Sequence, residues 1–431
     1  MHPFLRILGI VVVFTVATVG WFVLAGVTES RTNTSRYSLS SQVVSLWGRA
    51  QVQAAPTLVL YWQEEVVESK DTVDAHGNVV GRRVERHFES RTQNVDPAST
   101  RINVDMHQDE RRKGLMWFPL YDVGFDGTWT YTHAQSLARD LQISFPFPDS
   151  DAMYDDFHFV VNGTELGAEA RPVGGVASTT IHVEPGQSVS FAVKYKSRGA
   201  DTWSYQPTAG VGQVEDFALA MTTDFKKVDF VVPGRSPSAK QETADGWKLD
   251  WEYTRAVAGF GMGMVMPTRV QPGQLATSLA FSAPLSLGLY FLWIYVLGIL
   301  KGKEAHPINY FFLSGAFFAF NLLFAYTADH LDVEYAFALS AGVSLGLAVS
   351  YLRLVLGARF AFLEAGIAQL LYQVGFATAH FFDGFTGLTV TVLGILTLFA
   401  LMQMTGRMDW SSVLGGKGRG AAKPAPAPIP A

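Results

Sequence analysis

Cysteine is absent from this chain of 431 residues, and neither sign of charge dominates, since the net charge at pH 7 is −5. Without cysteine, the chain cannot be a small secreted scaffold held by disulfides. The slightly negative charge gives no electrostatic footprint for binding nucleic acid. The chain is not disordered as a whole either, because 48% of its residues are hydrophobic. The fold must therefore be stabilised by the burial of apolar side chains, without disulfides.

Charge is scarce outside one central region. Of the 33 basic and 38 acidic residues, 55 lie between positions 28 and 278. A single soluble domain would not segregate charge in this way. The flanking regions contain apolar stretches of roughly 18 residues or more, long enough to cross a bilayer as helices. The six predicted spans are 7–27, 279–300, 308–328, 335–352, 360–382 and 385–404.

The first apolar stretch predicts an uncleaved membrane anchor. Signal peptides have apolar cores of about 7–15 residues, and the stretch 7–27 is longer. Cleavage after Ala25 or Gly26 is the alternative.

The basic residues outside the central region all fall on one side of the six predicted spans. That side also holds both termini, whereas the opposite loops contain Asp329, Asp332, Glu334 and Asp383 and no Lys or Arg. Basic loops stay cytoplasmic, so we expect cytoplasmic termini and a periplasmic central domain in a bacterial inner membrane. The basic residues are Arg6, Lys301, Lys303, Arg353, Arg359, Arg407, Lys417, Arg419 and Lys423.

The central region shows the alternation typical of strands. Leu58, Leu60 and Trp62 alternate with residues of the other face, and a turn-forming cluster at 74–78 followed by residues 79–91 predicts a hairpin. Two later segments alternate in the same way. They contain Ile102, Val104 and Met106, and Trp247, Leu249, Trp251 and Tyr253.

The expected fold class is therefore an α+β membrane protein. We predict an N-terminal transmembrane anchor over 1–27, a large sandwich-like β-rich domain over 28–278, and a bundle of five transmembrane helices over 279–404. A disordered cytoplasmic tail would cover 405–431. Two lobes of the β-rich domain would divide near 146–156. Tyr37 through Gln53 is expected to be helical, and Pro-Gly pairs at 185–186, 233–234 and 272–273 to separate strands.

Motifs for catalysis are lacking: HExxH, Walker A, GxSxG and CxxC do not occur. Asp149, Asp151, Asp155 and Asp156 could bind calcium, although a solvated acidic loop is the simpler interpretation. Seven of the ten tryptophans lie in the central region and could form a sugar- or peptide-binding platform, but aromatics at period two usually belong to a core. We predict no catalytic residue, no metal and no cofactor.

Polar residues within the predicted spans are the better candidates for function, because polar groups in hydrocarbon are costly and face the bundle interior. Gln369, Gln373 and His380 are separated by four and seven residues, so a regular helix would place them on one face. Glu364 lies off that stripe, and Asn321 adds an amide to the third span.

Two interpretations of these polar residues remain open. In the first, they form a proton or solute path in which Glu364 and His380 titrate. In the second, which we favour, they are structural. Glu364 would then pair with Arg359 or Arg353, His380 would cap the helix near Asp383, and the amides would bond between helices.

Three short motifs resemble the CreD family of inner-membrane proteins. The segment Glu-Arg-Arg-Lys-Gly-Leu-Met-Trp-Phe-Pro-Leu-Tyr at 110–121 resembles its Arg-x-x-Gly-hydrophobic-x-x-x-Pro-x-Tyr pattern. His-Pro-x-x-Tyr at 306–310 and Thr-x-x-x-Asp-Trp at 405–410 resemble its third-span entry and its closing segment. The motif residues are Arg112, Gly114, Pro119, Tyr121, His306, Pro307, Tyr310, Asp409 and Trp410.

The resemblance implies an inner-membrane protein linked to cell-envelope integrity, to tolerance of envelope-active toxins and β-lactams, and to control by a two-component sensor. It implies no established catalytic residue. Locally, residues 111–113 are expected to form a turn, Pro119 to lie at a strand edge, and Pro307 to begin a helix.

The leading hypothesis is a non-enzymatic protein of the bilayer whose periplasmic domain binds an envelope component or a periplasmic protein. A proton-coupled transporter or channel using the fifth span is the alternative. A periplasmic envelope hydrolase, resting on the acidic cluster at 149–156, is the weakest of the three.

Overall fold

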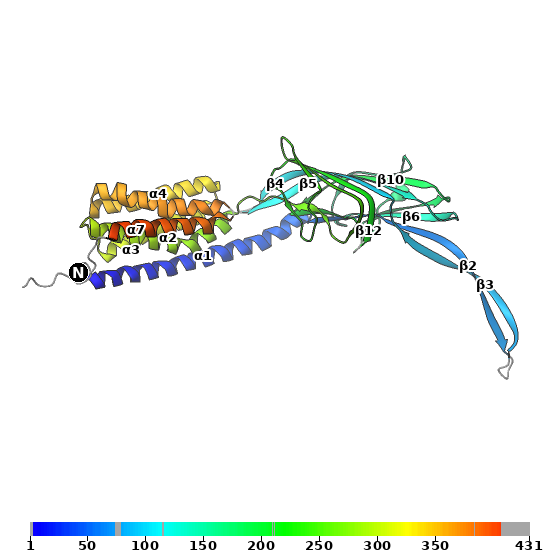
Figure 1. Ribbon diagram of the computed structural model, residues 1–431, viewed down its shortest axis with the longest axis horizontal. Helices are drawn as coiled ribbons and strands as arrows, with labels where there is room; N and C mark the ends of the chain where they lie inside the picture. The colour runs from blue at the N-terminus through cyan, green and yellow to red at the C-terminus, as the bar shows by residue number, and fades with distance from the viewer. Residues whose placement is uncertain are drawn as a thin grey trace, which may run out of the picture. The chain divides into compact units, whose positions relative to one another are not determined.

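A computed structural model describes residues 3–73, 79–113, 116–208, 210, 212–382 and 384–406. The chain divides into two compact units: Met1–Ser38 with Val270–Ala431, and Leu39–Arg269. The first unit is helical and the second is built of β-sheets (Figure 1). The predicted α+β fold class, with one N-terminal apolar helix, a β-rich middle and five C-terminal apolar helices, is confirmed.

Six helices of the described residues are long and apolar enough to cross a membrane. The fifth span, Phe360–Phe381, alternates between helix types, whereas the other five are α-helices throughout. Those five are α1 (Pro3–Trp47), α2 (Pro272–Leu300), α3 (Pro307–Thr327), α4 (Val333–Leu356) and α7 (Phe385–Thr405). The fifth span consists of the π-helical turn η2 (Phe360–Ala365), α5 (Gly366–Gln369), the π-helical turn η3 (Leu370–Gly375), α6 (Phe376–Thr378) and the 3₁₀ turn η4 (Ala379–Phe381).

Prolines begin two of the spanning helices. Pro307 occupies the first turn of α3, as expected, and the His306 side chain accepts a hydrogen bond from the backbone N–H of Ile308 at 3.3 Å. Pro272 likewise begins α2, so the expectation that Pro272-Gly273 separates strands is wrong. Both prolines stand where the helix has no use for their missing N–H.

The predicted helix from Tyr37 through Gln53 is right only up to Trp47. Gly48 ends α1, with φ of +91° and a hydrogen bond from its N–H to the carbonyl of Val44. A side chain at position 48 would also collide with the Arg198 carbonyl oxygen, 2.8 Å from the Cβ position. Beyond this stop the chain forms a strand, with the Gln51 and Gln53 side chains buried.

Three sheets make up the β unit. The strand order of the largest is β14-β15-β12-β4-β5-β10-β7-β8, and the two smaller sheets run β1-β11-β16-β13 and β3-β2-β6-β9. Their bounds are β1 (Gln51–Ala54), β2 (Thr57–Val73), β3 (Val79–Val95), β4 (Ser99–Lys113), β5 (Met116–Thr132), β6 (Arg139–Pro146), β7 (Tyr154–Val161), β8 (Thr164–Glu165), β9 (Val176–Val183), β10 (Ser188–Ala200), β11 (Thr202–Gln206), β12 (Gly212–Thr223), β13 (Asp229–Phe230), β14 (Ala239–Glu242), β15 (Trp247–Ala258) and β16 (Met262–Val265).

One core joins the inner faces of these sheets. The predicted half-buried strands are confirmed: Ile102, Val104 and Met106 of β4 are at most 2% exposed, and their neighbours along the strand face outward. Phe125 of β5 lies at the centre, with its ring centroid 5.0 Å from Tyr195 and 6.4 Å from Trp203. Packing of aromatic rings thus stabilises this core, which contains no disulfide.

The sheets do not divide near residues 146–156. Strand β6, which precedes this segment, pairs with β9, and β5 pairs with β10 along thirteen residues. Strands from before and after the segment therefore alternate within the same sheets, and Leu39–Arg269 is a single compact unit.

Candidate functional site

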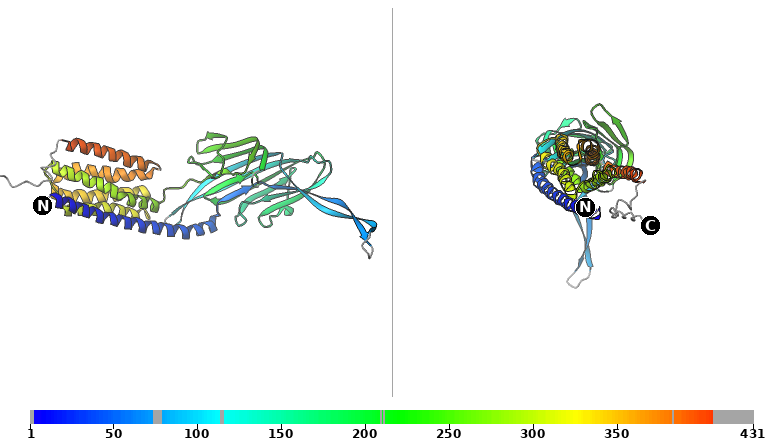
Figure 2. Two further views of the ribbon diagram at one scale, coloured as in Figure 1. Left: turned by 60° about the horizontal axis from the view of Figure 1, so that its bottom comes forward. Right: turned by 90° about the vertical axis from the view of Figure 1, so that its left-hand side faces the viewer.

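The hairpin of β2 and β3 leaves its sheet and continues as a two-stranded arm. Strand β6 pairs with β2 only from Thr57 to Tyr61, whereas β3 stays paired with β2 from Leu58 to Val73. We call residues 62–73 and 79–91 the arm, which extends beyond the sheets in both Figure 1 and Figure 2. The predicted hairpin is confirmed in its two strands, and its expected turn at 74–78 lies outside the described residues.

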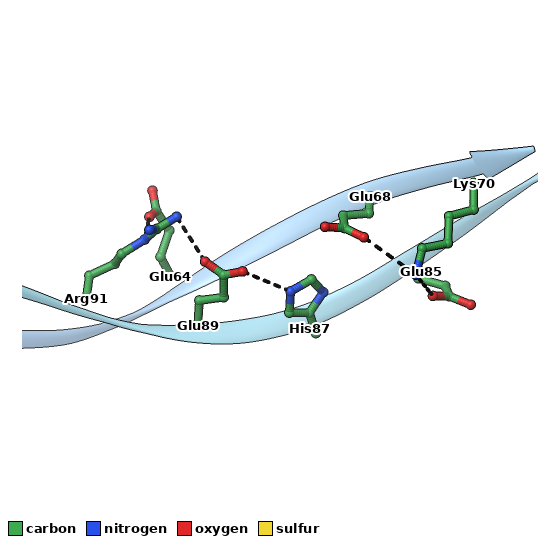
Figure 3. A network of polar contacts seen from close by, with 7 residues as sticks. All are labelled: Glu64, Glu68, Lys70, Glu85, His87, Glu89 and Arg91. Carbon is green, nitrogen blue, oxygen red and sulfur yellow. Dashed lines mark hydrogen bonds and ion pairs between the residues drawn. The ribbon is translucent and has the colours of Figure 1, made fainter.

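One face of the arm carries a chain of ion pairs (Figure 3). Arg91 contacts Glu64 on the opposite strand at 2.8 Å and Glu89 at 3.0 Å, and His87 contacts Glu89 at 3.2 Å. Towards the tip, Lys70 reaches across to Glu85 at 3.2 Å. This hydrogen bond to Glu85 raises the pKa of Lys70 above its ordinary value. An isolated two-stranded hairpin is marginally stable, so these cross-strand pairs favour the extended arm.

The opposite face of the arm carries three exposed apolar residues among polar ones. Because successive side chains of a strand point to opposite faces, Val67, Val84 and Phe88 share the face away from the ion pairs. Their exposed fractions are 56%, 57% and 71%. We call these three residues the arm stripe. Glu65 lies directly across from Phe88 and Arg86 across from Val67, and the two charged groups approach each other to 3.6 Å.

The arm stripe was not among the residues predicted from the sequence. Two signals could have indicated it. The paired strands are 17 residues long, about three times the usual length. Phe88 is also the single aromatic residue within the charged run of residues 81–90.

The amides predicted for the membrane interior do come together. Gln369 Nε2 donates to Gln373 Oε1 at 2.9 Å and to Ser344 Oγ at 3.1 Å, and Gln373 Nε2 donates to the Phe317 carbonyl at 3.2 Å. The Ser344 hydroxyl lies 2.7 Å from the Ala316 carbonyl oxygen and 2.8 Å from Gln373 Oε1. This cluster, which we call the amide cluster, joins α3, α4 and the fifth span.

The remaining polar residues of the spans lie elsewhere. Asn321 is buried one turn along α3, with its amide 3.5 Å from the Phe317 carbonyl oxygen. His380 sits in the 3₁₀ turn η4, with its ring 5.6 Å from that of Phe376 and no hydrogen bond to either glutamine. The π-helical turn η3 separates His380 from Gln369, so the single stripe expected from α-helical spacing is not formed.

Glu364 pairs with a different cation from the two that were expected. Its carboxylate contacts the Lys301 ammonium, and neither Arg353 nor Arg359 forms an ion pair with it among the described residues. Lys301 follows directly after α2, so this pair ties the end of α2 to the start of the fifth span. Arg359 adds only a longer-range attraction.

Replacing Gln373 with leucine should test whether the amide cluster holds the helices together. The change removes the acceptor shared by Gln369 and Ser344 and the donor to Phe317, so unfolding should become easier by about 1–2 kcal/mol. Gln403→Leu on the exposed face of α7 is the matched control and should shift stability by less than about 0.5 kcal/mol. Unfolding in a detergent titration measures both, and equal stability of the two variants would refute the structural role.

The acidic residues at 149–156 do not converge on a common centre. Asp149 faces Arg49 at 3.4 Å, while Asp156 contacts His158 at 3.1 Å and Lys196 at 3.3 Å. Hydrogen bonding to His158 lowers the pKa of Asp156, whereas a general acid needs a raised one. Within the described ranges, no group of three or more metal-binding side chains occurs.

His158 is expected to titrate above its ordinary pKa of about 6.5. The hydrogen bond to Glu165 at 2.6 Å is the main cause, and Asp156 adds to it. Because the folded-state pKa is raised, the interaction stabilises the fold below the unfolded pKa and is lost as pH rises through the folded one.

His182 is a second histidine whose pKa a neighbouring carboxylate raises, and single mutations should shift the two pKa values independently. Glu165→Gln should lower the pKa of His158 and leave His182, whose pKa is raised mainly by Asp140, unchanged. Asp140→Asn should do the reverse. Histidine-labelled NMR titrations of the two variants check both shifts, and a parallel shift of both histidines in either variant would contradict the assignment.

The tryptophans of the β unit do not form an open binding platform. Trp129, Trp203 and Trp251 are completely buried in the core. Two partly exposed rings are covered by arginines: Trp62 by Arg139 at 4.6 Å, and Trp117 by Arg269 at 4.4 Å.

The first of the three sequence motifs forms the end of the β4–β5 hairpin. Arg111, Arg112 and Lys113 belong to β4 and pair with β5, so the turn expected there is wrong. Pro119 lies within β5, one residue beyond the last β5–β10 pair, so only β4 is paired with β5 at this position. The Pro119 carbonyl accepts a hydrogen bond from the N–H of Asp201. Gly114, Asp409 and Trp410 lie outside the described residues.

Two further motif residues are buried tyrosines. Tyr121 donates to the Thr202 carbonyl at 2.8 Å, which links the largest sheet to β11. Tyr310 of α3 is fully buried, with its ring 5.0 Å from that of Phe291 on α2. Both therefore connect elements rather than line an open site.

The apolar helices and the central sheets define a multi-pass membrane protein with one large β domain between its first and second spans. The family described as "Inner membrane protein CreD" matches residues 2–273 and 280–411. The chain therefore belongs to the CreD family of inner-membrane proteins.

Comparisons with other proteins add little to the family assignment. No curated protein matches the chain. A putative nutrient binding protein from Legionella pneumophila is 10% identical, with a TM-score of 0.29, covering 58% of this chain and 82% of the other. An M1 zinc metallopeptidase from Deinococcus radiodurans is 11% identical, with a TM-score of 0.23, covering 78% of this chain and 96% of the other. Both TM-scores are too low to carry an argument.

Proposed function

We propose that this protein is a non-enzymatic component of the bacterial inner membrane that supports cell-envelope integrity or tolerance of envelope stress. Its β domain faces the periplasm, both termini are cytoplasmic, and the arm binds a protein partner of the envelope. The distribution of basic residues supports this orientation. The family resemblance supports the link to the envelope.

The single observation that carries the proposal is the arm stripe. Val67, Val84 and Phe88 are exposed on the outer part of the β2–β3 pair, beyond the residues at which β6 pairs with β2. An aromatic residue with a flanking arginine is the composition that protein interfaces favour. The cross-strand ion pairs on the other face favour the extended arm, so the arm stripe stays exposed beyond the sheets.

A photo-crosslinking residue placed at position 88 of the full-length protein in living cells tests the proposal. The expected result is a discrete crosslinked partner that is absent when the same residue replaces Leu137, an exposed position outside the arm with 59% exposure. Capture of the same abundant neighbours at both positions would count against partner binding by the arm.

A proton-coupled transporter or channel is the second candidate, and one observation favours it. Gln369 lies between the π-helical turns η2 and η3, and π-helical turns are frequent at functional sites. Gln369 Oε1 is buried, and none of the residues that the structure describes donates a hydrogen bond to it. Flux through proteoliposomes that is lost in Glu364→Gln or His380→Ala would establish transport, and flux equal to that of empty vesicles would exclude it.

A further inference from the structure

A groove runs between α4 and the fifth span on the surface of the helical unit. Its volume is about 450 Å³, and its apolar lining includes Leu345, Val349, Phe362 and Leu370. Gly346 contributes no side chain to the groove, and a Cβ at this position would meet no atom within 4 Å. This surface belongs to two spanning helices, so its surroundings are hydrocarbon or another helix.

One end of the groove carries a positive charge. Arg353 lines the groove at the last turn of α4, and no carboxylate pairs with it in the part of the chain that the structure describes. The neighbouring lysines are already engaged: Lys301 pairs with Glu364, and Lys303 donates to the Leu356 carbonyl at 2.6 Å. Among the residues that line the groove, Arg353 is therefore the cation available to neutralise a ligand.

We propose that this groove binds an anionic phospholipid, with an acyl chain along the apolar lining and the phosphate on Arg353. A guanidinium forms paired hydrogen bonds with phosphate oxygens, and a cation at the end of a spanning helix lies at the depth of the headgroups. A second copy of the chain would have to bring an acidic residue to this arginine, whereas every anionic lipid already carries the matching charge. The charge at the groove's end therefore favours lipid over protein.

Lipid titration of the full-length protein, delipidated in detergent and followed by native mass spectrometry, tests the proposal. The probes are phosphatidylglycerol and phosphatidylcholine with identical acyl chains. Phosphatidylglycerol should bind about five-fold more tightly, as expected for one cation near an anionic headgroup. Arg353→Gln should remove this preference, and Arg353→Lys should keep most of it.

Two glycine variants separate the acyl-chain site from a general effect on the bundle. Gly346→Leu fills the groove and should weaken binding of both lipids at least five-fold. Gly394→Leu is the control, because Gly394 on α7 also faces open space. Equal affinity of the wild type for the two lipids, or equal losses in the two leucine variants, would overturn the proposal. Conversion of a lipid-free dimer to a monomer by Gly346→Leu would also overturn it and assign the groove to a second copy.

Discussion

Phe88→Asp is expected to abolish the envelope function that we propose for the protein while leaving its β domain folded. Phe88 is 71% exposed and contributes nothing to the core, so its loss should barely alter folding. A charge in the middle of the arm stripe would have to be desolvated on contact with a partner. Loss of a central aromatic contact typically costs about 2 kcal/mol or more, which corresponds to binding at least about 30-fold weaker.

The measurement is survival under detergent or β-lactam stress in cells that lack the gene and express each variant. Phe88→Asp should fail to restore survival, whereas Leu137→Asp, the same chemical change at an exposed position outside the arm, should restore it fully. Glu364→Gln/His380→Ala tests the spans in the same assay. Rescue by Phe88→Asp together with failure of the double variant would assign the function to the membrane-spanning helices instead of the arm.

Tyr121→Ala is expected to destabilise the β domain by about 3–5 kcal/mol. The Tyr121 side chain is 1% exposed, and its ring lies against Gly199. A Cβ added at position 199 would approach the tyrosine hydroxyl to 2.3 Å, so only glycine leaves room for the ring. Burial raises the pKa of Tyr121, so the hydroxyl keeps its proton and donates to Thr202. Alanine would remove this bond and leave a cavity between two sheets.

Tyr121→Phe separates the contribution of the hydroxyl from that of the buried ring, and Tyr37→Ala is the control for loss of an exposed ring. Tyr121→Phe keeps the ring and should cost only about 1 kcal/mol, the usual value of one hydrogen bond. Tyr37→Ala removes a ring that is 81% exposed on α1 and should change stability by less than about 0.5 kcal/mol. Denaturant unfolding followed by tryptophan fluorescence reports on the β domain. A loss in Tyr121→Ala no larger than in Tyr37→Ala would contradict the assigned role.

Features that depend on local pattern could be predicted from the sequence. Apolar length located the spans, and period-two alternation located β4 and β15 because each buries one face. The helix predicted over residues 37–53 ends at Trp47 because Gly48 adopts a positive φ, and a glycine of this kind is a stop signal that the sequence does contain. The sequence pattern does not contain the second constraint, which is that a side chain at position 48 would meet the Arg198 carbonyl.

The candidate sites depended more on contacts between distant segments. The burial of Gln369 and Gln373 was predictable from helical spacing, but their bonds to Ser344 and to the Phe317 carbonyl join three helices. Glu364 was assigned to nearby arginines, yet Lys301, 63 positions away, lies closer in space. Strand length and Phe88 could have indicated the arm stripe, but the point at which β6 stops pairing with β2, and the arm begins, depends on a contact between distant segments.

The two π-helical turns affect how the fifth span can change in length. In an α-helix, deletion of one residue rotates everything beyond it by about 100°, which would turn buried side chains toward lipid. A π-helical turn already contains one extra residue, so deletion within Phe360–Ala365 or Leu370–Gly375 would leave an α-helical turn with the flanking faces unchanged. Single-residue gaps among relatives should therefore cluster at these two turns and avoid α3 and α4, where the same gap would break the bundle.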